Sequence, residues 1–192
     1  MRHSKLLWRV AVASAVLLII VFIVTVVLPK QSGQDNGGSQ ITDKYKVETA
    51  PEIDRMFESL NSDVEEQLNG VQALELHDSS DSSISTSKGT KYHFFINENG
   101  RIEQMMPQNG DKILIVCDME NAEGKFAEKT YDALVHLVAW LLGQCDLDMD
   151  DVTRHYDEAG DACPKYYVEN ESAWEDFKMD VEKYIETYGV KK

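Results

Sequence analysis

The longest apolar segment of the chain lies close to its N-terminus. Val10 to Leu28 contains 19 residues without a charged side chain, and only Ser14 and Thr25 among them are polar. At about 1.5 Å per residue, a helix of this length spans roughly 28 Å, which is close to the thickness of the hydrocarbon core of a bilayer. The pattern predicts one N-terminal transmembrane helix, with a cleaved signal peptide as the alternative.

The flanking charges predict how this helix is oriented. Arg2, Lys5 and Arg9 precede the apolar segment, so the positive-inside rule places the N-terminus in the cytoplasm and residues 31–192 outside the cell. Cleavage is disfavoured because the segment exceeds the usual apolar core of a signal peptide and no small-x-small site follows it. We therefore expect residues 1–30 to be the cytoplasmic tip and anchor of a single-pass cell-membrane protein with an extracellular C-terminal domain.

Two segments are expected between the anchor and the main domain. Residues 31–49 are predicted to be a flexible linker, because residues 31–43 are rich in Gly, Ser and Gln. Residues 50–70 are predicted to form a membrane-proximal helix packed on the domain, with Pro51 in its first turn and Gly70 just past its end. Its apolar residues recur at helical spacing, at Ile53, Met56, Phe57, Leu60, Val64 and Leu68.

Residues 71–192 are expected to form the main domain. Alternating or continuous apolar segments predict strands at residues 71–77, 92–97, 101–106 and 112–117. Asn99-Gly100, between the second and third of these, is typical of a β-hairpin. Apolar stripes predict helices over residues 130–144 and 172–188. The order of elements predicts an α/β fold, with a mixed central β-sheet flanked by helices.

The net charge of −15 is unevenly distributed. Residues 1–30 hold four of the 19 basic residues and no acidic one, so residues 31–192 hold 34 acidic and 15 basic residues, a formal charge of −19. So acidic a domain does not bind nucleic acid, because phosphate contacts require clustered Lys and Arg. A hydrophobic content of 43% also excludes disorder over most of the chain.

Side chains suited to catalysis or metal binding are concentrated between Arg154 and Pro164, in the sequence RHYDEAGDACP. Gly160 and Pro164 indicate a loop. His155 and Cys163 can converge on one ion if the chain turns at Gly160, and imidazole and thiolate are good zinc ligands. Their spacing is not that of a zinc finger, so the residues alone leave open a solvent-facing histidine and a buried cysteine.

The longer run RHYDEAGDACPKYYVENESAWEDF resembles the C-terminal signature of the type 2 family of zinc-dependent N-acetylmuramoyl-L-alanine amidases, which cleave peptidoglycan. The usual form is R-H-Y-D-x-T-G-K-x-C-P, followed by a W-x-x-F helix that Trp174 and Phe177 match. KYHFFINENGRIEQMMP resembles the strand-hairpin-strand of the family, and ALELHDSS resembles its first strand, which ends in a metal-binding histidine. The resemblance covers about residues 71–188.

The resemblance implies that His77, His155 and Cys163 bind Zn²⁺. It also implies that Tyr92 contacts the reacting water or the developing oxyanion; a half-buried strand aromatic is the alternative. The implied reaction is hydrolysis of the amide bond between N-acetylmuramic acid and L-alanine in peptidoglycan, with Cys163 as a nucleophile the alternative enzyme chemistry. With Cys163 on zinc, Cys117 and Cys145 become a candidate disulfide.

The departures from the family pattern keep other functions open. Asp161 replaces the Lys of T-G-K, so it is expected either to repel developing negative charge, to point away, or to act as a base for water. The family's acidic residue on the central strand is also missing, and two loops are shortened. The expected function is a membrane-anchored cell-wall amidase. The alternatives are a catalytically impaired relative that binds peptidoglycan fragments or a cell-envelope partner, and a structural domain.

Overall fold

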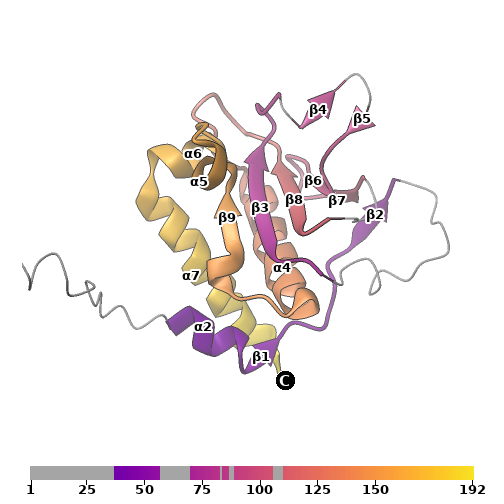
Figure 1. Cartoon of the computed structure of the whole chain (residues 1–192), viewed down its shortest axis with the longest axis vertical. Coiled ribbons are helices and arrows are strands. Elements are labelled where there is room, and N and C mark those ends of the chain that lie inside the picture. The colour runs from indigo at the N-terminus through magenta and orange to yellow at the C-terminus, as the bar shows by residue number, and fades with distance from the viewer. Residues whose placement is uncertain (1–36, 57–69, 83, 87–88, 106–109) are drawn as a thin grey trace, which may run out of the picture. The chain divides into compact units, whose positions relative to one another are not determined.

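The structure is a computed structural model that describes residues 37–56, 70–82, 84–86, 89–105 and 110–192 (Figure 1). The predicted anchor at Val10–Leu28 lies outside these residues. Within the described ranges, none of the helices has the length and apolar character needed to cross a membrane.

A mixed sheet of six strands forms the centre of the described domain (Figure 1). Across the sheet the order is β2 (Ile53–Arg55), β7 (Ile102–Gln104), β6 (Phe94–Ile96), β8 (Lys112–Cys117), β3 (Ala73–Asp78) and β9 (Val152–Arg154). Within this sheet β6 and β7 pair antiparallel and the other neighbours pair parallel. The mixed central sheet and the four strands predicted between residues 71 and 117 are confirmed.

The turn between β6 and β7 explains the antiparallel pair. The Asn97 side chain accepts hydrogen bonds from the backbone N–H groups of Asn99 and Arg101, at 3.0 and 3.1 Å. Gly100 has φ of 78°, and a Cβ atom at this position would lie 2.5 Å from the carbonyl oxygen of Lys129. Glycine is therefore required here both for the backbone conformation and for space.

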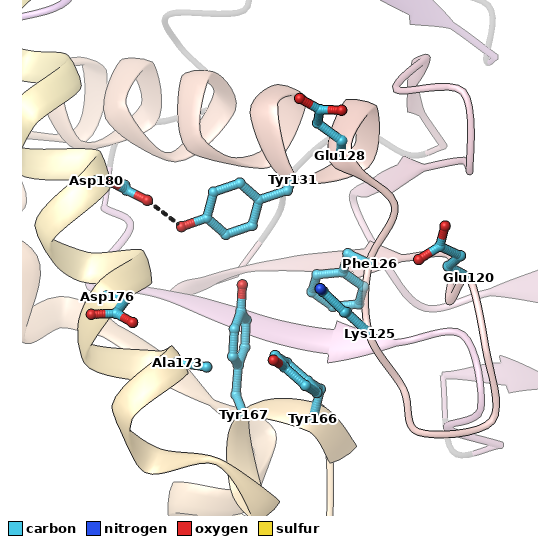
Figure 2. Close-up of a pocket in the computed structure, with 10 residues that line it drawn as sticks. All are labelled: Glu120, Lys125, Phe126, Glu128, Tyr131, Tyr166, Tyr167, Ala173, Asp176 and Asp180. Carbon is cyan, nitrogen blue, oxygen red and sulfur yellow. Dashed lines mark hydrogen bonds between the residues drawn. The ribbon is translucent and has the colours of Figure 1, made fainter.

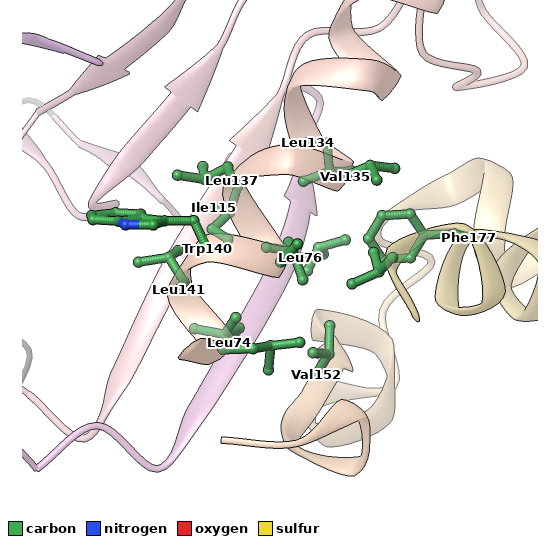
Figure 3. Close-up of a cluster of buried hydrophobic side chains, with 14 of the residues drawn as sticks. Leu74, Leu76, Ile115, Leu134, Val135, Leu137, Trp140, Leu141, Val152 and Phe177 are labelled. Carbon is green, nitrogen blue, oxygen red and sulfur yellow. The ribbon is translucent and has the colours of Figure 1, made fainter. Parts of the chain in front are cut away.

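Two long helices, α4 (Glu128–Cys145) and α7 (Glu171–Tyr188), pack on one face of the sheet (Figures 1 and 3). Leu74 and Leu76 of β3 point to this face, where they meet α4 and Phe177 of α7 (Figure 3). Because side chains alternate along a strand, Glu75 and His77 point to the opposite face. β3 thus contributes side chains to the hydrophobic core on one face and a set of buried polar groups on the other.

Shorter elements complete the described domain. They are α2 (Gly37–Thr42), β1 (Tyr45–Lys46) paired with β10 (Val190–Lys191), β4 (Ser85–Thr86) paired with β5 (Gly89–Thr90), the 3₁₀ helix η1 (Met149–Asp151), α5 (His155–Ala159) and α6 (Lys165–Glu169). Helix α5 lies where the sequence predicted a loop, and β9, just before it, is a strand that the sequence did not predict. β9 forms because it pairs with β3, a long-range contact that leaves no local pattern.

Two predictions for the segment before residue 71 are corrected. Residues 37–42 form helix α2 within the predicted linker, since Thr42 is buried and Ile41 packs on the core. The helix predicted over residues 50–70 does not begin there, because Ile53–Arg55 form β2 and pair with β7. Residues 57–69, the remainder of that prediction, lie outside the described part of the chain.

The candidate disulfide between Cys117 and Cys145 is also wrong, because both cysteines are free. Thr130, in the first turn of α4, donates a hydrogen bond to the carbonyl oxygen of Asn97, 2.8 Å away, next to the carboxyl ends of β6 and β8. Cys117 is at this end of the domain. Cys145 is the last residue of α4, at the other end of a helix about 27 Å long.

Candidate metal centre

The carboxyl end of β3 carries the polar side chains of the site. Glu75 and His77, on the face away from α4, are 6% and 2% exposed. Asp78 fixes a distant segment against this strand end: its backbone N–H points to Cys163 Sγ at 3.4 Å, and its carboxylate accepts a hydrogen bond from the backbone N–H of Lys165 at 2.6 Å. Cys163 is thereby held beside His77.

The pairing of β9 with β3 positions the second histidine, His155. In the parallel register of β3 and β9, Leu76 lies opposite Arg154, so the next residue, His155, lies beside His77. The two imidazole rings stack with their centroids 4.6 Å apart and 30° between their planes. The pairing of two short strand segments therefore brings together histidines 78 positions apart in the sequence.

The turn after α5 brings Cys163 back to the site. Gly160 ends α5 with φ of 77° and donates its backbone N–H to the carbonyl oxygen of Tyr156 at 2.9 Å. The N–H of Tyr156 in turn donates to the carbonyl oxygen of Cys163, also at 2.9 Å. The chain thus reverses at Gly160, as predicted, and its return places the backbone of Cys163 beside Tyr156, the residue after His155.

A buried arginine holds the surrounding elements together. The guanidinium of Arg154 donates to Asp157 at 2.8 Å, to Glu171 at 2.7 Å and to the carbonyl oxygen of Tyr167 at 3.1 Å. It also lies over the Trp174 ring, 5.2 Å from the ring centroid. These contacts join β9, α5, α6 and α7, and so position the ends of the segment that carries His155 and Cys163.

Each edge of the histidine pair faces a carboxylate. At one edge, Glu75 Oε1 lies 3.0 Å from His155 Nδ1 and 2.9 Å from His77 Nε2. At the other edge, Asp81 Oδ2 lies 2.9 Å from His77 Nδ1 and 3.8 Å from His155 Nε2. Cys163 Sγ is on this second edge, 3.9 Å from His77 Nδ1. The side chains of His77, Asp81 and Cys163 form one group able to hold a metal ion, and Glu75, His77 and His155 form another. His77 belongs to both groups, but among the described residues His155 and Cys163 do not share one, so the three predicted ligands are divided between the two groups.

These donors fit a zinc ion at the second edge. A tetrahedral zinc with Zn–S of about 2.3 Å and Zn–N of about 2.0 Å requires its sulfur and nitrogen ligands to be about 3.5 Å apart, and His77 Nδ1 and Cys163 Sγ are 3.9 Å apart. His77 Nε2 is buried and lacks hydrogen-bond geometry within the described residues, although it lies close to Glu75. A carboxylate at the far edge of ligating imidazoles is the usual arrangement around zinc.

The carboxylates of the cluster favour positive charge beside them: burial alone would lower the pKa of His77, but its contacts with Glu75 and Asp81 raise it. The pKa of Glu75 is lowered to about 2, mainly by the neighbouring His77 imidazole. Burial opposes this shift, whereas His155 and Lys112 add to it. Burial is the main cause that raises the pKa of the Cys163 thiol to about 12. This sulfur therefore becomes a thiolate only beside a positive charge.

The two predicted catalytic residues occupy different positions. Asp161 is 79% exposed, and its Oδ2 lies 3.9 Å from His155 Nε2, at the same edge as Asp81. Tyr92 is half-buried beside Phe95, with ring centroids 6.1 Å apart, and burial raises its pKa. Within the described residues, no hydrogen bond or ion pair joins Tyr92 to His77, His155 or Cys163.

Sequence reasoning missed three members of the cluster. Glu75 stands two positions before His77, and strand alternation was a signal that both share one face. Lys112, which contacts Glu75 at 3.1 Å and also pairs with Glu158, depends on the register of β8 against β3. Asp81 reaches His77 only through the turn after β3, for which the sequence offered no pattern.

The fold and this cluster define an α/β domain with metal-ligand side chains at the carboxyl edge of a mixed sheet. The family model for N-acetylmuramoyl-L-alanine amidase, Amidase_2, matches residues 64–166, and because this is more than half of the chain, the protein belongs to that family. The resemblance stated from the motifs is thereby confirmed.

Solved structures agree on the fold. A mutant of PlyL is 15% identical with a TM-score of 0.53, and the match covers 69% of this chain and 99% of the PlyL chain. The PlyG catalytic domain is 15% identical with a TM-score of 0.51, and the match covers 69% of this chain and 94% of that domain. No curated protein matches the chain.

Proposed function

We propose that this protein is a membrane-anchored extracellular zinc amidase that hydrolyses the amide bond between N-acetylmuramic acid and L-alanine in peptidoglycan. The observation that carries the proposal is the position of His77, which lies beside Cys163 and stacks on His155, in a chain that belongs to the amidase family. The basic residues before Val10–Leu28 support the membrane anchor and the extracellular placement.

His77, His155 and Cys163 would hold the zinc ion, which supplies a Lewis acid that polarises the scissile carbonyl and acidifies water. The chain's own contribution is orientation. Glu75 fixes His155 through the hydrogen bond at Nδ1, which leaves Nε2 directed toward the second edge. Asp81, which lies between the two imidazoles at that edge, is a further candidate ligand.

Two residues are proposed to act on the substrate side. Asp161 lies on the exposed side of His155, where its carboxylate can accept a proton from the attacking water. Tyr92 is proposed to stabilise the developing oxyanion through its hydroxyl, which its raised pKa keeps protonated.

The test measures zinc content and then amide hydrolysis by the full-length chain. We expect about one zinc per chain by elemental analysis, and release of peptides that begin with L-alanine from purified peptidoglycan. Cys163→Ser should lose both zinc and hydrolysis, whereas Cys145→Ser, at a free cysteine on α4, should retain both. A wild-type chain without zinc would refute the zinc amidase.

Asp161 supports a second candidate, a catalytically impaired domain that binds peptidoglycan fragments or a cell-envelope partner. In the resembling family a lysine stands here, and a carboxylate would repel negative charge that develops nearby. Zinc-loaded protein that binds peptidoglycan but releases no peptide would favour this function. An Asp161→Lys variant that gains hydrolysis would identify the carboxylate as the cause.

A further inference from the structure

A cavity lies on the opposite side of the sheet from the candidate metal centre. It has a volume of about 500 Å³ and opens between α4, α6, α7 and the loop that follows β8 (Figure 2). Leu74 and Leu76 point to the helix-covered face and Glu75 and His77 to the other, so the sheet separates this cavity from the candidate zinc ligands. A ligand bound in this cavity would therefore not contact the candidate zinc ligands.

The lining combines aromatic rings with an excess of carboxylates. Its residues are Glu120, Lys125, Phe126, Glu128, Tyr131, Tyr166, Tyr167, Ala173, Asp176 and Asp180. Four carboxylates and one lysine give this lining a formal charge of −3. Anions are disfavoured by that charge, and a cation is attracted both by the carboxylates and by the faces of the aromatic rings.

Tyr167 at the base of the cavity is held rigidly by its neighbours. Its ring packs edge-on against Phe126 with centroids 5.6 Å apart, stacks on Phe177 at 5.6 Å, and lies 5.5 Å from Trp174. The backbone carbonyl of Tyr167 accepts a hydrogen bond from Arg154 at 3.1 Å. The direction of its hydroxyl is therefore set by the core of the domain and not by solvent.

That hydroxyl has no hydrogen-bond partner in the described part of the chain, although Tyr167 is only 2% exposed. Figure 2 shows it pointing into the cavity, in the space between Tyr131 and Lys125. The neighbouring hydroxyl of Tyr131, by contrast, donates a hydrogen bond to Asp180 at 2.6 Å. Buried hydroxyl groups are normally paired, so the Tyr167 hydroxyl marks a position for a ligand atom.

We propose that this cavity binds a primary ammonium group on an aliphatic stem, namely the side chain of a lysine in a peptide or protein partner. The Tyr167 oxygen would accept a hydrogen bond from the ammonium, and Asp176 and Glu128 would supply the opposite charge. The stem would lie against the Phe126 and Tyr166 rings. A compact ammonium fits a single acceptor at the base of a cavity better than a guanidinium, whose planar fork requires paired acceptors.

The binding test uses two probes that differ only in the charged group. Nα-acetyl-lysine methylamide carries the ammonium, and Nα-acetyl-norleucine methylamide has the same stem without it. Each is titrated into the full-length chain labelled with ¹⁵N-tyrosine. We expect the lysine probe to shift the backbone amide signals of Tyr131, Tyr166 and Tyr167 and to leave those of Tyr45 and Tyr188 unchanged. Equal shifts with the norleucine probe, or none up to about 50 mM, would overturn the proposal.

Variants separate a ligand contact from a structural role. Tyr167→Phe removes only the hydroxyl, so the free chain should keep or raise its melting temperature while the lysine probe binds at least about fivefold more weakly. Asp176→Asn should also weaken binding, and Glu186→Gln, outside the cavity on the same helix, should not. A fall in the melting temperature of the free Tyr167→Phe chain, or unchanged binding, would show that the hydroxyl does not serve a ligand.

Discussion

Replacing His93 with glutamine should remove a defined part of the acid sensitivity of this fold. His93 is 6% exposed and its Nδ1 accepts a hydrogen bond from the backbone N–H of Leu114 at 3.0 Å. Its Nε2 is buried without a partner in the described residues. Burial lowers the pKa of this imidazole from 6.5 to about 4, because removal from water disfavours the charged form and the Leu114 N–H requires an unprotonated Nδ1.

The direction and size of the change in stability follow from the difference between the pKa values of His93 in the unfolded and folded chains. Between pH 6.5 and pH 4 the unfolded chain protonates His93 and the folded chain does not, so acidification favours unfolding. Each pKa unit corresponds to about 1.4 kcal/mol, and the full difference therefore corresponds to about 3 kcal/mol. His93 leaves stability unaffected above pH 6.5, and this amount is lost as the pH falls from 6.5 to about 4.

The assay is urea unfolding of the wild-type chain and His93→Gln from about pH 7.5 to about pH 4.5. The glutamine amide oxygen can still accept the Leu114 N–H but does not titrate. As the pH falls, the free energy of unfolding of His93→Gln minus that of the wild type should rise by about 2 to 3 kcal/mol, because only the wild type loses stability through His93. Thr130→Val, which removes another buried hydrogen bond, should give a constant gap. Parallel curves for the wild type and His93→Gln would refute the reasoning.

Two other predictions test the site and the hairpin. Glu75→Gln should weaken zinc binding about 10- to 100-fold, because the carboxylate that orients His155 is lost; competition with a chelator measures this, and unchanged affinity would contradict the orienting role. Gly100→Ala should destabilise the chain by more than about 1 kcal/mol in urea unfolding, since its φ is positive and Lys129 leaves no room. Gly110→Ala, where a Cβ meets nothing within 4 Å, is the control, and equal losses in the two variants would contradict the steric argument.

The elements that the sequence predicted correctly are those with a local signal. The apolar run of β8, the alternation of β3 and the Asn99-Gly100 turn each specify their structure within a few residues. The apolar surface of α4 likewise predicts a helix buried against the sheet. These signals were sufficient for the α/β class and for the order of the central elements.

The elements that were missed depend on contacts between distant segments. β2 and β9 are three-residue strands whose hydrogen-bond partners are β7 and β3, and neither has a pattern of its own. Helix α2 forms in a Gly- and Ser-rich sequence because Thr42 and Ile41 pack on the domain. Tertiary packing thus overrides weak local preference at the edges of the sheet.

The same distinction applies to the metal centre. The resemblance predicted His77, His155 and Cys163 as ligands. The carboxylates that favour positive charge there are those of Glu75 and Asp81, which only the folded chain brings to the two edges of the imidazole pair. Their side chains are 7% and 9% exposed, and a buried carboxylate is stable only when it is paired with positive charge. Lys112 offsets one of them. The carboxylates therefore favour positive charge at the imidazole pair, which either a proton on His77 or a divalent cation beside His77 and Cys163 would supply.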